Sequence, residues 1–202
     1  MRFLISSLLW ATLISCTSYP KKKGFTPTSP TADHSANPYF SDQTKDYVYK
    51  ANIKAFNRSF GGIFIVKKVG ANHHRIVFTT ELGNKIFDFT FKEDLFEVNH
   101  VAKELNRKPL LKILKNDFRV LVTETALVEK SFTGNETILN QARVGKQKHF
   151  YFNNIGGLQK IIKVKNEKGK VEFIFSEISD DFAKHIQILH QNLDLDITLK
   201  AI

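Results

Sequence analysis

The sequence predicts a mainly β protein built from antiparallel strands, and three observations carry this prediction. From Thr44 onward, apolar and polar residues alternate with period two in many short segments, as they do in strands that bury one face. Gly, Asn and Asp residues separate these segments at the spacing of hairpin turns. A single segment, residues 108–122, carries its apolar residues at helical spacing instead. We therefore expect about nine or ten strands and one well-formed helix.

The first 16 residues have the features of an export signal. Arg2 gives a short positive start, and the run from Phe3 to Leu13 is mostly apolar. This run is shorter than the ~20 apolar residues of a membrane-spanning helix, but it suits the core of a secretory signal peptide. Leu13-Ile14-Ser15-Cys16 then resembles the lipobox of bacterial lipoproteins. The resemblance implies that residues 1–15 are removed and that Cys16 is acylated; an ordinary secreted protein with an incidental cysteine is the alternative.

Residues 16–43 are expected to form a flexible tether that begins at the acylated Cys16. They hold four of the five prolines, together with Ser, Thr, Asn and the run Lys21 to Lys23, and few large apolar residues. Such a composition cannot offset the entropy of ordering by burial. Residues 44–202 are expected to form one domain, which is long enough to bury a core of its own. Because Cys16 is the sole cysteine, no intramolecular disulfide can support that core.

The first half of the domain is predicted to be a meander of five antiparallel strands. Its second strand contains Gly61-Gly62, which suggests a bulge or a close backbone approach. Residues 81–84, Glu-Leu-Gly-Asn, form a tight turn between the third and fourth strands. The expected strands cover residues 47–55, 60–68, 74–80, 85–91 and 95–100.

The predicted helix follows this meander. Pro109 suits a first helical turn, where its missing N–H would have no partner in any case. The apolar residues form one stripe, and Lys112, Lys115, Asn116 and Arg119 lie mostly off it. We expect a helix over about residues 108–122 that packs onto the sheet through the stripe. The stripe consists of Leu110, Leu111, Leu114, Phe118, Leu121 and Val122.

Strands are expected to resume after a polar stretch that follows the helix. Residues 166–169, Asn-Glu-Lys-Gly, are typical of a hairpin turn. The C-terminal segment alternates strictly between apolar and polar residues. The expected strands cover residues 148–152, 158–165, 170–176, 186–190 and 193–202.

The formal net charge of +10 is compatible with several kinds of partner. An exported protein does not ordinarily meet nucleic acid, and the lysines are scattered without an Arg-rich recognition helix. We therefore expect no nucleic-acid partner. The basic surface would suit anionic lipid headgroups or an acidic protein, or would serve solubility alone.

Motifs that would indicate an enzyme are missing from the sequence. No Gly-x-Ser-x-Gly elbow, His-Glu-x-x-His or Walker loop occurs. His73 and His74 are neighbours in a predicted strand and would point to opposite faces, which makes them a poor metal pair. The acidic pairs Glu93-Asp94 and Asp180-Asp181 lie at element ends, where turn roles suffice. We expect no catalytic activity, no metal and no cofactor.

A large antiparallel sheet must bury its apolar face against something. The sheet could pack on a second sheet, close into a barrel, or curl into a half-barrel closed by helices and a ligand. One helix of about 15 residues cannot cover the concave side of such a sheet, and soluble proteins rarely leave large apolar patches exposed. Bound acyl chains would resolve this, and so would unrecognised helices near residues 101–106 or 179–185. A lipid cavity and a filled core are both compatible with the pattern.

The order of these features resembles the LolA/LolB lipoprotein-localisation family, and LolB in particular. The resemblance spans most of residues 45–202: the strand FGGIFIVKK, the pair HRIVFTTELGNKIFDFTF, the proline-led helix KPLLKILKNDFRVLV and the closing segment HIQILHQNLDLDITLKAI. It implies a mainly β, half-open curved antiparallel barrel with a helical lid. It further implies a monomer, anchored in the bacterial outer membrane and facing the periplasm, that receives lipoprotein acyl chains from a periplasmic LolA-like carrier and inserts them into that membrane.

The resemblance also implies residue roles. Leu82, followed by Gly83, matches an exposed turn leucine associated with delivery into the membrane, although a leucine folded back on its hairpin is the alternative. This chain has Glu81 where the family commonly has Pro, and Phe stands where the family often has Trp. The candidate acyl-cavity lining is Phe64, Val66, Phe78, Phe87, Phe89, Phe91, Leu111, Leu114, Phe118, Phe150, Phe152, Phe173 and Phe175.

Two other readings of function stay open at this point. The same fold could serve an envelope lipid-binding lipoprotein, or a structural or adaptor lipoprotein without insertion activity, that binds another envelope protein. An envelope hydrolase would need a polar cleft in which a nucleophile, a base and a donor converge.

Overall fold

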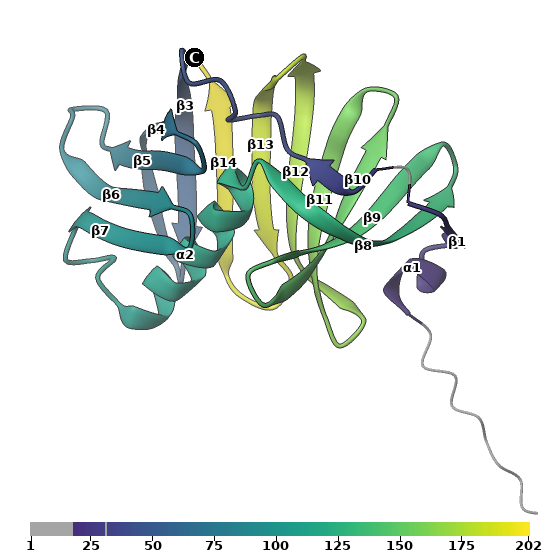
Figure 1. Ribbon diagram of the computed structural model, residues 1–202. Coiled ribbons are helices and arrows are strands. Elements are labelled where there is room, and N and C mark those ends of the chain that lie inside the picture. The colour runs from purple at the N-terminus through teal and green to yellow at the C-terminus, as the bar shows by residue number, and fades with distance from the viewer. Residues whose placement is uncertain (1–17, 31) are drawn as a thin grey trace, which may run out of the picture.

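The computed structural model describes residues 18–30 and 32–202. Almost all of the regular structure is β (Figure 1). The helices are α1 (Tyr19–Lys22) and α2 (Lys108–Val122). The strands are β1 (Thr26–Thr28), β2 (His34–Ala36), β3 (Asp46–Ala55), β4 (Arg58–Gly70), β5 (His73–Thr79), β6 (Lys85–Lys92), β7 (Leu95–Val101), β8 (Thr125–Gly134), β9 (Thr137–Val144), β10 (Gln147–Asn154), β11 (Gly157–Lys165), β12 (Lys168–Ser179), β13 (Phe182–His190) and β14 (Leu195–Ala201).

The strands form one curved antiparallel sheet that does not close into a barrel. Its order is β1-β8-β9-β10-β11-β12-β13-β14-β3-β4-β5-β6-β7, and β2 pairs with β8 off this path. The C-terminal strand β14 lies beside β3, so it joins the two meanders through the register Ile197↔Ile53. The predicted fold class, a mainly β protein with a curved, half-open antiparallel sheet, is confirmed.

Helix α2 connects the two ends of this sheet. It follows β7 at one edge and precedes β8 near the other, and the sheet curls around it (Figure 1). Its bounds, Lys108–Val122, are those predicted, with Pro109 in the first turn. Leu114, Phe118 and Leu121 are almost fully buried against the sheet, as the apolar stripe predicts.

The N-terminal meander β3–β7 follows its predicted order. Gly62 is a point of close backbone approach, because a Cβ built on it would lie 1.8 Å from the carbonyl oxygen of Thr79 on β5. Gly61 next to it has open space within 4 Å. The close approach proposed for the Gly-Gly pair is therefore confirmed for one of the two glycines.

Strands β8 and β9 occupy the stretch that sequence reasoning treated as a polar connection. Their alternation is masked by buried polar residues that bond to each other, such as the Ser131 hydroxyl donating to Asn140 Oδ1 at 2.8 Å. A two-residue turn joins the strands, with Asn135 and Glu136 at φ of 46° and 59°. The Asn-Glu turn at residues 166–167 has the same left-handed geometry, and there the hairpin prediction is confirmed.

The helices considered for residues 101–106 and 179–185 do not form. Residues 102–107 form turns and irregular chain after β7. Residues 179–185 hold the end of β12, a turn at residues 180–181 and the start of β13, and the two strands pair through Ser179↔Phe182. The sheet is instead covered by α2 and by a segment from before β3.

The prediction of a flexible tether is wrong for residues 18–30 and 32–43. Strands β1 and β2 both pair with β8. Tyr39 and Phe40 are 0% and 1% exposed within the main core, and the Tyr39 ring lies 4.6 Å from that of Phe175. Prolines and small polar residues suggested disorder, but strand pairing with β8 and burial of these aromatic residues hold the segment against the domain.

The predicted signal peptide and the acylation site Cys16 lie outside the described residues. Within the described part of the chain, no helix has both the length and the apolar character to cross a membrane.

Candidate functional site

An aromatic cluster fills the concave side of the sheet beneath α2. Phe118 on α2 sits with its ring centroid 5.4 Å from Phe64 on β4 and 5.6 Å from Phe87 on β6. Phe87 and Phe89 stack at 4.6 Å with their planes 5° apart. All of these rings are 0% exposed. The helix therefore occupies the place that sequence analysis assigned to acyl chains.

Most of the predicted lining residues meet in this main core, and two do not. Phe150 belongs to a separate cluster with Phe132 and Tyr19, and Phe152 packs beside it. Tyr151, between them, points into the main core. The strand phase assumed for β10 was therefore wrong. The residues brought together in the main core are Phe64, Val66, Phe78, Phe87, Phe89, Phe91, Leu114, Phe118, Phe173 and Phe175, with Leu111 half-buried against them.

Polar contacts fasten α2 to its surroundings. The Arg119 guanidinium donates to the backbone carbonyls of Asp94 and Leu95 at 3.1 and 2.7 Å, and also to that of Glu93. Asn37 Nδ2 donates to the carbonyl of Leu121 at 2.9 Å. The Arg119 bonds join α2 to the β6–β7 turn, and the Asn37 bond joins the C-terminal turn of the helix to the segment before β3.

A buried carboxylate and a buried imidazole face each other between the middle of α2 and β13. Asp117 Oδ2 lies 3.1 Å from His190 Nε2, and both side chains are about 2–3% exposed. His190 Nδ1 faces the carbonyl oxygen of Leu195 at 2.9 Å. A cavity of about 170 Å³ adjoins the pair and is also lined by Lys163 and Lys170. Burial lowers the pKa of Lys163.

The β5–β6 turn presents Leu82 to solvent. Its side chain is 91% exposed, so it is not folded back on its own hairpin. The turn is well defined: Thr80 N donates to the Asn84 carbonyl at 2.8 Å, and Gly83 adopts a φ of 85° that favours glycine. Glu81 beside it pairs with Lys50 at 3.0 Å, which compensates its charge.

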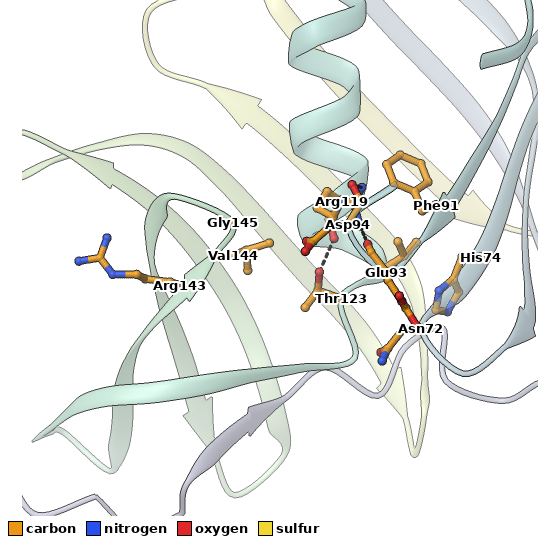
Figure 2. A pocket seen from close by; sticks show the side chains of 11 residues that line it. Asn72, His74, Phe91, Glu93, Asp94, Arg119, Thr123, Arg143, Val144 and Gly145 are labelled. Carbon is orange, nitrogen blue, oxygen red and sulfur yellow. Dashed lines mark hydrogen bonds between the residues drawn. The ribbon is translucent and has the colours of Figure 1, made fainter. Parts of the chain in front are cut away.

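A basic groove runs between α2 and the β9–β10 turn. We use this name for two adjoining cavities of about 220 and 310 Å³, which share Asp94, Arg119, Val144 and Gly145. Figure 2 shows the first cavity, with Arg119 and the β6–β7 turn on one side and Val144 and Gly145 on the other. The second cavity adds basic residues along the flank of the helix. These are Lys112 and Lys115 on α2, and Lys146 in the turn.

The floor of the groove holds a buried neutral imidazole. His149 is 0% exposed, and burial lowers its pKa to about 4. Its Nδ1 faces the carbonyl oxygen of Gln147 at 3.0 Å, so Nδ1 carries the proton and Nε2 is an acceptor. Nε2 is buried and has no hydrogen-bond partner among the described residues.

Sequence reasoning missed this groove as a site. It noted that Lys112, Lys115 and Arg119 lie off the apolar stripe, which was the available signal. The opposite wall comes from the β9–β10 turn, in a stretch that was not recognised as strands. The paired histidines were read correctly as pointing apart: His74 is buried with Nε2 3.0 Å from the Phe40 carbonyl, whereas His73 is half-buried.

Groups of three or more His, Cys, Asp or Glu side chains that could hold a metal ion do not occur in residues 18–30 and 32–202.

Comparisons with known proteins add little to these observations. No family model matches the chain, and no curated protein matches it. Among solved structures, the chain is similar to a DUF1329 family protein from Desulfovibrio piger, with 8% identity, a TM-score of 0.39, and coverage of 78% of this chain and 83% of that one.

Proposed function

We propose that this protein is an outer-membrane-anchored lipoprotein that receives lipoprotein acyl chains from a periplasmic carrier and passes them to the membrane. The observation that carries the proposal is the concave phenylalanine surface, which is covered by helix α2 and by the segment that contains Tyr39 and Phe40. The structure has this surface covered, so an acyl chain would bind by displacing the helix.

The free energy lost when α2 is lifted from the sheet and the free energy gained when an acyl chain is buried there are of comparable size. Lifting α2 exposes six buried apolar side chains, and each side chain of this kind is worth about 1.5–3 kcal/mol; they are Leu110, Leu114, Phe118, Val120, Leu121 and Val122. The total is roughly 9–18 kcal/mol. One buried methylene contributes about 0.8 kcal/mol, so a single chain of about 16 carbons supplies roughly 13 kcal/mol. A long acyl chain can therefore replace the apolar face of α2, and a short one cannot.

Leu82 supports the delivery step. A large apolar side chain held in water by a well-defined turn gains about 2 kcal/mol on entering lipid. Its position on the β5–β6 turn agrees with the role that the LolB resemblance gives to it.

Lipid capture can be tested on the full chain with Cys16→Ala, so that no acyl group of its own competes. A triacylated lipopeptide is added, and native mass spectrometry measures the complex. We expect a one-to-one complex that a lipopeptide with acyl chains of four carbons does not form.

Helix displacement is tested separately with spin labels, because Cys16 is the only native cysteine. Labels at Lys112 on α2 and Lys54 on β3 are expected to change their separation when the lipopeptide binds. Labels at Lys54 and Lys184, both exposed on the sheet, serve as the matched control and should stay at a fixed distance. A bound lipopeptide without any change at Lys112 would contradict displacement of α2.

The filled interior favours a second candidate, a structural or adaptor lipoprotein. Tyr39, Phe40 and the apolar residues of α2 fill the main core, so the apolar face of the sheet is buried without a ligand. This candidate predicts no lipopeptide complex and no movement of Lys112.

A further inference from the structure

We propose that the basic groove binds the anionic phosphate headgroup of a lipid whose acyl chain enters beside α2. This inference rests on the proposed function in one respect: it takes the acyl-chain space beside α2 from that proposal. The ligand inferred here is a phospholipid, because the acylated cysteine of a lipoprotein carries no phosphate. The groove lies along the open side of the sheet, between the helix that covers the concave face and the hairpin opposite to it.

The charges in the groove are suited to an anion. Lys112, Lys115 and Arg119 lie at spacings of three and four residues, which places them on one flank of α2. Lys146 faces them from the β9–β10 turn. Two carboxylates line the groove: Asp94, which borders both cavities, and Glu93, which borders the smaller one. Within the described ranges, none of these three lysines forms an ion pair.

The remaining cations around the groove are already engaged. Arg143 pairs with Glu129 and points away from the cavity in Figure 2. Arg119 donates to backbone carbonyls, which hold its guanidinium at the groove without cancelling its charge. The field of the groove therefore comes from charges that lack a carboxylate partner, and such a concave site concentrates anions.

The floor of the groove distinguishes a lipid from a free anion. Val120 and Val144 line the larger cavity and belong to the main core, so the groove leads from a basic rim to apolar residues. His149 also lines this cavity, but its side chain is 0% exposed, so its Nε2 is not open to a ligand in this structure. A ligand with a phosphate and an alkyl chain matches the basic rim and the apolar floor in order.

The test uses lipids with long acyl chains and the full chain carrying Cys16→Ala. Isothermal titration calorimetry compares vesicles of dioleoylphosphatidylglycerol, vesicles of dioleoylphosphatidylcholine, and inorganic phosphate, at two ionic strengths. We expect the anionic lipid to bind at least tenfold more tightly than the zwitterionic one, and this preference to fall as salt rises. Inorganic phosphate should bind more weakly than the anionic lipid.

The groove variant is Lys112→Glu with Lys115→Glu and Lys146→Glu. Its matched control carries the same change at Lys54, Lys184 and Lys200, which are exposed on the neighbouring strands β3, β13 and β14. The groove variant should lose at least tenfold in affinity for the anionic lipid and keep its affinity for the zwitterionic one. The control should lose neither.

Each of the following results would overturn the inference. Equal binding of both lipids, unchanged in the groove variant, would remove the headgroup site and leave acyl-chain capture standing. Phosphate binding as tight as the anionic lipid would indicate a free-anion site. Loss of cargo transfer in the groove variant, with lipid preference intact, would indicate an acidic protein partner instead. Binding of neither lipid, together with no lipopeptide complex, would remove both this inference and the proposed function.

Discussion

Replacing Gly62 by Ala should destabilise the sheet at the base of the Leu82 turn. The new methyl carbon would lie 1.8 Å from the Thr79 carbonyl oxygen and 3.1 Å from Phe78 Cε2. Ordinary contacts begin near 3.4 Å, so β4 and β5 must separate by more than about 1 Å at this point. The contact involves backbone, which cannot rotate away as a side chain would.

The cost follows from what the separation breaks. Overpacking of this kind typically costs about 1–3 kcal/mol, and the loss of one strand hydrogen bond adds about 1 kcal/mol. We expect the free energy of unfolding to fall by roughly 2–4 kcal/mol. For a domain of this size, the melting temperature would fall by roughly 2–4 °C for each kcal/mol.

Gly61→Ala is the matched control, because a Cβ there meets nothing within 4 Å. That variant should be neutral or up to about 0.5 kcal/mol more stable, since Ala restricts the unfolded chain. Urea unfolding should be followed by far-UV circular dichroism. Tryptophan fluorescence does not suit this comparison, because the sole tryptophan, Trp10, lies in the predicted signal peptide. Equal stability of the two variants would refute the reasoning, since they differ only in which glycine touches β5.

Three further predictions concern single side chains. Leu82→Glu should leave the urea midpoint unchanged, because the side chain is 91% exposed, and should slow lipoprotein insertion into liposomes at least tenfold; unimpaired insertion would remove its delivery role. Asp88→Asn should lower the free energy of unfolding by roughly 2 kcal/mol at pH 7, because Asp88 accepts two hydrogen bonds from Arg75. These hydrogen bonds lower the pKa of Asp88, so the advantage of the wild type exists above about pH 4 and disappears as the pH falls further. The urea unfolding curves of the two proteins should therefore converge at low pH. His149→Gln should make the free energy of unfolding less sensitive to acid. The pKa of His149 is about 4 in the folded protein and 6.5 in the unfolded chain, so the wild type loses up to about 3 kcal/mol of stability relative to the variant between pH 6.5 and 4. Parallel profiles of stability against pH for the two proteins would contradict this.

Local patterns predicted the elements whose own sequence determines them. Helix α2 could be bounded to the residue because Pro109 marks its start and its apolar stripe persists over four turns. The hairpin at residues 166–167 was predictable because Asn tolerates the left-handed conformation that the turn requires. The exposure of Leu82 was expected from the family resemblance, whereas its own sequence also allowed a side chain folded back on the hairpin; the structure shows it 91% exposed.

The elements that were missed depend on partners distant in sequence. Buried Ser131 and Asn140 satisfy each other across two strands, which a window of sequence cannot show. The N-terminal segment is ordered by Tyr39 in a core built by residues far along the chain. The basic groove is likewise assembled by the curl of the sheet, which brings Lys146 to face α2.

The docking of α1 has a consequence for how far the domain can travel. Tyr19 and Pro20 are buried against the sheet, and Tyr19 packs with Phe132 and Phe150. Cys16 precedes Ser18 by two residues, a span of at most about 7 Å. With Cys16 acylated, the body of the protein would rest almost on the bilayer, with Lys21 to Lys23 exposed beside the point of attachment. If the proposed receptor function holds, a domain attached this closely could not reach across the periplasm for its cargo, and the carrier would have to come to the membrane.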